Sequence, residues 1–214
     1  MPASANTIGY FFTHPEAIIY GVASALLYPV LFIELAALVY ATAELGRFSV
    51  EMYKRRKARA GLDIEQVAQT VRKQVAQQDT SAASQFLTAL EVSPVAKAVL
   101  GTLRQGEAIT RSRILKALAD AELEMSRILE RTRMLIRIGP MLGLMGTLIP
   151  ISPALVALAQ GNVQELSNKL VVAFSTTVVG LLIGAIGYVI TTVRDRHYQR
   201  DIVDVEYVLD QMKG

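Results

Sequence analysis

The stretch GPMLGLMGTLIPISPAL, residues Gly139–Leu155, places three glycines and three prolines in a run whose other residues are apolar except for Thr147 and Ser152. In a water-soluble helix, glycine costs about 1 kcal/mol and proline about 3 kcal/mol relative to alanine. Both residues are frequent in helices that lie in lipid, where neighbouring helices and hydroxyl side chains satisfy the freed backbone groups. The stretch therefore indicates a membrane helix.

Three segments are long and apolar enough to cross a bilayer, which takes about 20 mostly apolar residues. They comprise residues 17–45, 135–159 and 170–193. The whole chain is 52% hydrophobic and 19% charged, whereas soluble proteins have about 25% charged residues. The leader of a secreted protein begins with basic residues, but none precedes the first span here. We therefore expect this span to remain as a membrane helix. The sequence predicts an all-α membrane protein with three transmembrane helices.

Basic residues predict the orientation of these spans. None occurs before Arg47, whereas sixteen lie in residues 46–134 and four in residues 194–214. Since basic residues accumulate on the cytoplasmic side, both segments are predicted to be cytoplasmic. Residues 1–16 and the loop 160–169 then face outward. The cluster KRRKAR, Lys54–Arg59, is interpreted as a topology signal and an anchor to anionic lipid, with nucleic-acid binding as the alternative.

The cytoplasmic segment is predicted to be helical because Ala, Leu, Glu, Gln, Lys and Arg dominate it. Apolar residues from Ile64 to Val75 recur at helical spacing, residues 79–81 favour a break, and residues 92–106 favour a short helix. From about Glu107 the helical pattern continues into the second span. The third span continues in the same way through Leu209. These long extensions are expected to bury their apolar stripes against each other.

Small residues line the second and third spans at helical spacing. We expect them to let helices approach closely, including helices of neighbouring subunits. These helix-packing residues are Gly139, Gly143, Gly146, Gly180 and Gly184. Pro150 and Pro153 either kink the second span or expose carbonyl oxygens to a pore.

Among the hydroxyl side chains of the second and third spans, four are candidates for an ion path: Thr147, Ser175, Thr176 and Thr177. They either bond carbonyls of their own helix or line an ion path. Glu34 is the one carboxylate well inside a span, and is either a functional acid or a structural hydrogen-bond donor. The second and third spans contain no carboxylate, so an ion path along them needs a carboxylate from another chain.

Other functions have no support in the sequence. The chain has no cysteine and two isolated histidines, His14 and His197, so we expect no metal site. No nucleophile–base pair, phosphate-binding loop or aromatic-basic surface indicates an enzyme or a nucleic-acid binder. We therefore expect no cofactor besides a transported ion, H⁺ or Na⁺.

The region Arg133 to Arg196 resembles the MotA/TolQ/ExbB family, the channel-forming subunits of ion-driven motors in bacterial inner membranes. The resemblance lies in GLMGTLI (Gly143–Ile149), ALVALAQGN (Ala154–Asn162) and AFSTTVVGLLIGAI (Ala173–Ile186). It implies a homopentamer around a central pore, in a bacterial or archaeal cytoplasmic membrane. Inside the pore, a single-span partner of the ExbD/TolR/MotB type would supply a membrane aspartate.

The same resemblance implies that Thr147 and Thr177 face this aspartate, and that ion flow past it drives mechanical work. The chain departs from the family pattern at Val172, where ExbB and TolQ carry glutamate, and at Pro150 and Pro153. The paired Thr176 and Thr177 are more similar to sodium-driven stators. The alternative function is a non-conducting oligomeric membrane scaffold.

The orientation can be tested by cysteine labelling because the chain has no cysteine of its own. With the N-terminus outside, Ser4→Cys should react with an impermeant thiol reagent added to intact cells. Ser84→Cys, in the basic middle segment, should react only after the cells are permeabilised. The reverse labelling pattern would contradict the orientation.

Overall fold

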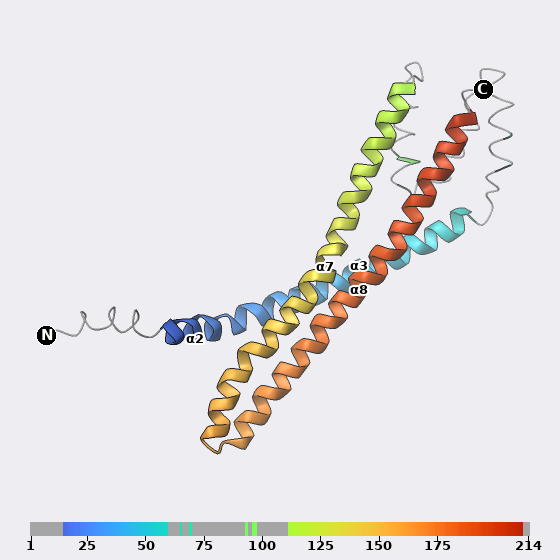
Figure 1. Cartoon of the computed structure of the whole chain (residues 1–214). Coiled ribbons are helices and arrows are strands. Elements are labelled where there is room, and N and C mark those ends of the chain that lie inside the picture. The colour runs from blue at the N-terminus through green and yellow to red at the C-terminus, as the bar shows by residue number, and fades with distance from the viewer. Residues whose placement is uncertain are drawn as a thin grey trace. The chain divides into compact units, whose positions relative to one another are not determined.

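The computed structural model describes residues 15–59 and 111–211, together with Glu65, Gln69, Ser93, Ala96 and Lys97. Its elements are the helices α2 (Pro15–Ala25), α3 (Leu27–Arg59), α7 (Arg111–Ala159) and α8 (Val163–Gln211), shown in Figure 1. The helix predicted from Ile64, the break at 79–81 and the short helix at 92–106 lie almost wholly outside the described residues, as does His14.

Three helical stretches in the described part are long and apolar enough to cross a membrane: Ile18–Lys57, Leu115–Ala159 and Val163–Tyr207. The first includes α2 and α3, which are joined at Leu26. The Leu26 amide donates to the carbonyls of Val22 and Ala23, so the backbone stays close to helical through the joint. The described residues thus form an all-helical structure with three helices long and apolar enough to cross a membrane, as the predicted fold class requires.

The second and third spans continue as helices well beyond their apolar segments, as predicted. α7 and α8 each contain 49 residues, which corresponds to about 73 Å at a rise of 1.5 Å per residue. Pro140, Pro150 and Pro153 all lie inside α7. Since proline lacks the amide that the helix needs, their position within one long helix fits a segment surrounded by other apolar groups.

A tight turn joins α7 to α8. Gly161 has φ 74°, a conformation that glycine adopts without strain. The Asn162 amide donates to the Ala157 carbonyl and the Gly161 amide to the Leu158 carbonyl, which caps α7. The Asn162 side chain accepts from the Glu165 amide at 3.1 Å and so caps the start of α8. The two helices therefore reverse direction within three residues.

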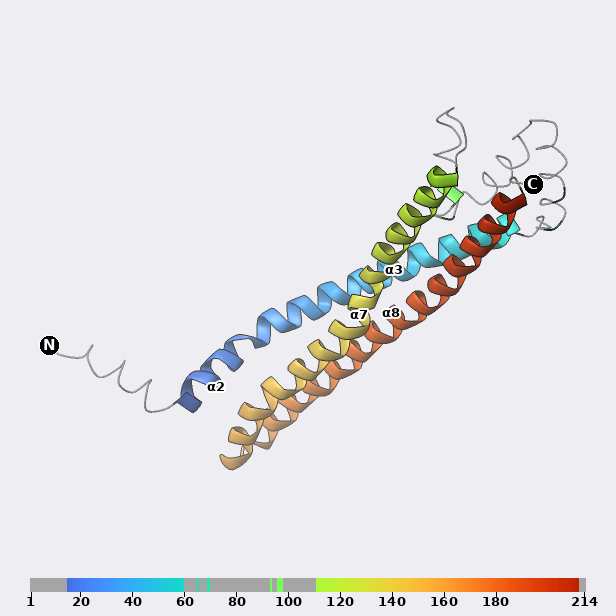
Figure 2. The same ribbon diagram turned by 45° about the horizontal axis from the view of Figure 1, so that its top comes forward.

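The helices divide into two compact units. The first unit comprises residues 1–42 and 134–187, and the second comprises residues 43–133 and 188–214. In the first unit α7 and α8 run side by side and antiparallel, as Figure 1 and Figure 2 both show. Its core contains Ala41 of α3, Leu135 of α7 and Ile183 of α8.

A line of glycines holds α7 against α8 in the first unit, and we call it the glycine seam: Gly139, Gly143 and Gly146 of α7, with Gly180 and Gly184 of α8. A Cβ atom at Gly139 would lie 2.6 Å from the Gly180 carbonyl oxygen, and one at Gly180 would lie 2.5 Å from the Gly139 carbonyl oxygen. Real Cβ atoms do not approach backbone atoms so closely. The two backbones can therefore meet here only because both residues lack side chains.

The second unit packs larger side chains. Leu118, Met125 and Leu129 of α7 are buried, as the predicted apolar stripe requires, and so is Val205 of α8. The Thr191 hydroxyl of α8 donates to the Thr132 hydroxyl of α7 at 2.7 Å. This bond joins the two helices at a point where both hydroxyls are buried.

The glycine seam predicts a large difference between two glycine-to-alanine changes. Gly180→Ala places a methyl group against the α7 backbone and should destabilise the protein by about 1–3 kcal/mol, the usual cost of overpacking a core. Gly46→Ala is the control, because a Cβ there meets nothing within 4 Å. Thermal unfolding of the full chain in detergent, followed by circular dichroism, measures both. Equal melting temperatures for the two variants would contradict the seam.

Candidate functional site

Thr176 lies inside the glycine seam. A Cβ atom at Gly146 would lie 2.6 Å from both the Cβ and the Oγ1 of Thr176, so the missing side chain at position 146 makes room for this threonine. Thr176 is 6% exposed, and its hydroxyl donates to the Ala173 carbonyl at 2.8 Å. The structure therefore places Thr176 as a packing residue between α7 and α8.

Thr147 and Thr177 lie at the edge of the seam and are half-buried. Each residue turns a helix by about 100°, which fixes the sides on which these two residues lie. Counting from Gly180 on α8, Ile183 lies about 60° to one side and Thr177 about 60° to the other. Counting from Gly139 on α7, Leu135 lies about 40° to one side and Thr147 about 80° to the other.

Leu135 and Ile183 mark the same side of the α7–α8 pair, because both pack against Ala41 of α3. Thr147 and Thr177 therefore share the opposite side, which we call the threonine side. Nothing in the spacing of a single helix could have shown this relation, since it depends on how the antiparallel pair packs. The two threonines predicted for an ion path are brought to one surface, away from α3.

Ser175 is separated from this surface. It lies about 140° from Gly180 around α8, is exposed, and donates to the Val171 carbonyl at 2.7 Å. It thus faces away from α7, so the structure does not bring it together with Thr147 and Thr177.

The hydroxyls of the threonine side also bond their own helices. Thr147 donates to the Leu144 carbonyl at 2.7 Å, and Thr177 donates to the Ala173 carbonyl at 3.4 Å. Each hydroxyl oxygen still has acceptor capacity, and the long Thr177 bond is a weak one. Both groups can therefore accept from a protonated acid or contact a cation without breaking the helix.

The glycines serve contacts within one chain. Gly139, Gly143 and Gly146 face α8 of the same molecule and are buried there. We expected them also to admit helices of neighbouring subunits. In the structure the helix that they admit is α8, so close approach between copies would need other surfaces.

Glu34 of α3 is buried at 3% exposure. Its carboxyl group lies beside the backbone of Gly180, and within the described residues Oε1 has no hydrogen-bond partner. Gly180 is thus contacted by Glu34 of α3 and by Gly139 of α7, so three helices meet at one glycine.

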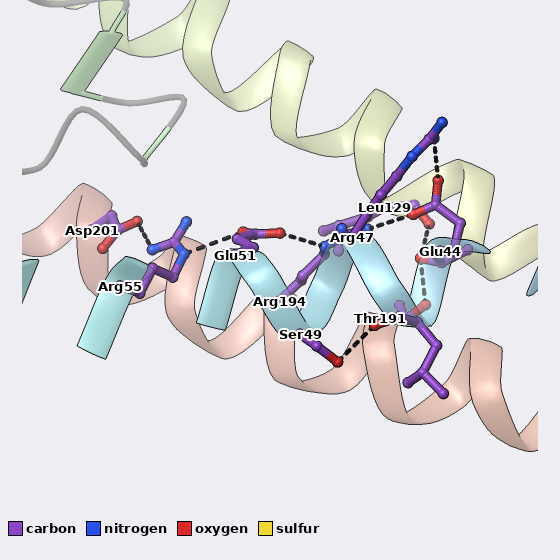
Figure 3. Close-up of polar contacts among 11 residues, drawn as sticks. Glu44, Arg47, Ser49, Glu51, Arg55, Leu129, Thr191, Arg194 and Asp201 are labelled. Carbon is purple, nitrogen blue, oxygen red and sulfur yellow. Dashed lines mark hydrogen bonds and ion pairs between the residues drawn. The ribbon is translucent and has the colours of Figure 1, made fainter. Parts of the chain in front are cut away.

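The second unit contains a chain of paired charges, most of them buried, that could not be identified from the sequence; it is drawn in Figure 3. Asp201 of α8 accepts from Arg55 of α3 at 2.6 Å, and Glu51 accepts from Arg55 at 3.2 Å. Glu51 also accepts from Arg194 of α8 at 2.9 Å. We call this set the charge ladder.

The charge ladder continues through Glu44. Arg194 donates to Glu44 at 3.3 Å, and Arg47 donates to the other oxygen of Glu44 at 3.0 Å. Three acids and three arginines alternate, so the ladder is neutral as a whole. Rings cover two of its cations: Arg55 lies 5.3 Å from the Tyr198 ring centre and Arg194 lies 5.9 Å from the Phe48 ring centre. Such rings attract guanidinium groups electrostatically.

The ladder corrects the interpretation of one part of the basic cluster Lys54–Arg59. Lys54, Arg56 and Lys57 are exposed, as an anchor to anionic lipid requires. Arg55 is 5% exposed and bound to Asp201, so it joins α3 to α8 and cannot contact lipid headgroups. A weak signal was present in the sequence: Glu44, Glu51 and Arg55 recur at intervals of seven and four residues, which places them on one helix face.

A cavity of about 350 Å³ lies between α7 and α8 of the second unit. Its lining is mixed in character and comprises Glu122, Met125, Ser126, Leu129, Arg133, Asp195, Tyr198, Gln199 and Ile202. Acidic, basic and apolar groups share this surface, so it favours no single ligand charge. Among the described residues, no group of three possible metal ligands is found.

Comparison with known proteins gives one match. The profile of the MotA/TolQ/ExbB proton channel family matches residues 91–206, which is more than half of the chain. No curated protein and no solved structure matches the chain.

We predict that a substitution at Asp201, the buried end of the charge ladder, strongly destabilises the protein. Asp201 is 0% exposed, and Asp201→Asn leaves Arg55 without its shortest ion pair. Removing one partner of a buried pair costs about 3–5 kcal/mol. The matched control is Glu124→Gln, whose partner Arg127 lies 3.8 Å away in an exposed pair that is worth about 0–1 kcal/mol. Similar melting temperatures for the two variants would show that the ladder does not hold α3 to α8.

Proposed function

Because the chain belongs to the MotA/TolQ/ExbB proton channel family, we propose that it is the channel-forming subunit of an ion-driven membrane motor. In this proposal the chain conducts H⁺ or Na⁺ and converts ion motive force into mechanical work. The observation that carries the proposal is the threonine side, where Thr147 and Thr177 share the surface opposite α3.

A second chain has to complete the ion path. Between Arg137 and Glu165 the helix α7 and its turn carry no acidic residue, and α8 carries none between Glu165 and Asp195. An ion that loses its hydration shell in an apolar site needs compensating charge. We therefore propose a single-span partner that brings an aspartate to the threonine side, as the family resemblance implies.

We further propose that five copies surround this partner, with their threonine sides toward the common axis. The arrangement leaves α3 on the lipid side, which fits its many exposed apolar side chains, among them Tyr28, Phe32, Leu35 and Val39. In the proposed orientation the turn at Gly161 faces outward and the C-terminus is cytoplasmic, in a bacterial or archaeal inner membrane.

One observation favours the alternative of a non-conducting scaffold. Every hydroxyl of the set Thr147, Ser175, Thr176 and Thr177 has a carbonyl partner in its own helix. Hydroxyls satisfied in this way are stable in lipid without any further role. The alternative therefore differs from the proposal in what happens when the hydroxyl of Thr177 is removed.

The test compares three variants of the chain expressed with its partner, taken as the single-span protein that co-purifies with it. Thr177→Val keeps the shape of the side chain but removes the hydroxyl, and should lower ion flux about tenfold or more, since losing a hydrogen-bonding group beside a charge costs about 1.5–3 kcal/mol. Thr177→Ser keeps the hydroxyl and should conduct. Ser175→Ala, which removes a hydroxyl on the opposite face of α8, should conduct normally.

Flux is measured in vesicles by the decay of an imposed H⁺ or Na⁺ gradient, and assembly by native mass spectrometry. The proposal requires that Thr177→Val assembles like the wild type. A Thr177→Val complex that conducts normally would contradict the proposal and favour the scaffold.

A further inference from the structure

The carboxyl group of Glu34 has no described counter-charge. On α3 the nearest charged residue toward the C-terminus is Glu44, ten residues or about 15 Å further along the helix at 1.5 Å per residue. On α8 no charged residue lies between Lys169 and Arg194. On α7 the charged residue nearest to Gly139, which packs against Gly180, is Arg137, and its side chain is exposed. No described residue donates a hydrogen bond to Oε1 of Glu34.

Glu34 lies on the face of α3 that forms the apolar core of the first unit. Ala37, Leu38 and Ala41 follow it by three, four and seven residues on that face, and they pack with Val179 and Ile183 of α8. The carboxyl group lies beside the Gly180 backbone. An ionised carboxylate in such a place is an unpaired buried charge, which costs far more free energy than a neutral acid.

We propose that Glu34 is a proton-binding site of this chain, in which a bound proton keeps the carboxyl group neutral where α3 packs beside Gly180 of α8. The proton is a stable part of the fold. It is separate from the transported ion, because α3 lies on the side of the α7–α8 pair opposite Thr147 and Thr177. The site therefore does not depend on the proposed motor function.

The folded and unfolded chains then differ in the protonation of Glu34. The folded chain keeps the proton on Glu34, whereas the unfolded chain exposes the carboxyl group, which ionises at neutral pH. The folded state therefore binds more protons, and the contribution of Glu34 to stability must fall as the pH rises. A neutral side chain of the same shape at position 34 removes this dependence.

The first experiment is infrared spectroscopy of the full chain in nanodiscs, with glutamate carboxyl groups labelled with ¹³C. The difference spectrum of wild type minus Glu34→Gln at neutral pH should contain the carbonyl band of a protonated acid. The matched control is Glu165→Gln, at an exposed position, whose difference spectrum should contain only carboxylate bands. A carboxylate band for Glu34 at neutral pH would overturn the proposal.

The second experiment measures thermal unfolding from mildly acidic to alkaline pH. Wild type and Glu34→Gln should melt at the same temperature in acid, and the wild type should melt several degrees lower than the variant at alkaline pH. Parallel pH profiles would overturn the proposal. In the flux assay Glu34→Gln should conduct, so a loss of flux with intact assembly would place Glu34 in the ion path and would also overturn it.

Discussion

The direct contact between the α7 and α8 backbones at Gly139 and Gly180 is the constraint on which the first unit depends. It sets the register of the antiparallel pair, because any shift along the helices would bring side chains into the space that these glycines leave open. The same register places Thr176 over Gly146. It also leaves Thr147 and Thr177 at the edge of the seam, where their hydroxyls remain half-buried.

Charged groups in the chain are neutralised in two different ways. In the second unit, three acids and three arginines alternate along the charge ladder. Each of its two buried arginines, Arg55 and Arg194, has two acidic partners and lies near an aromatic ring. In the first unit Glu34 has no such neighbour. A bound proton is then the simplest way to keep this carboxyl group in an apolar site.

Much of the fold could be predicted from the sequence because membrane helices leave strong local signals. The length of the apolar segments predicted three spans. The unbroken helical pattern from Glu107 predicted that the second span is part of one long helix, α7. The helix-packing glycines and the four hydroxyls were found by their residue type and spacing. That Thr147 and Thr177 share one side of the α7–α8 pair could not be found, since it depends on where α3 packs. The separation of Ser175 from Thr177 follows from helical spacing alone, because residues two apart lie about 200° apart around a helix.

The charge ladder shows a second limit of sequence reasoning. Arg55 stands within a run of basic residues that carries a clear topology signal, and nothing in that run distinguishes it from Arg56. Only the pairing of α3 with α8 brings Asp201, 146 positions further along the chain, to 2.6 Å from its guanidinium group. Contacts of this kind depend on tertiary packing, so the spacing of residues along one helix hardly predicts them.

The central claim is that the threonine side faces the axis of an assembly and α3 faces lipid. Single-particle cryo-electron microscopy of the full chain in nanodiscs tests it most directly. The account predicts five copies, with Thr147 and Thr177 of each copy toward the common axis and α3 on the outside. An assembly with α3 at the axis, or with the threonine side in contact with lipid, would contradict it.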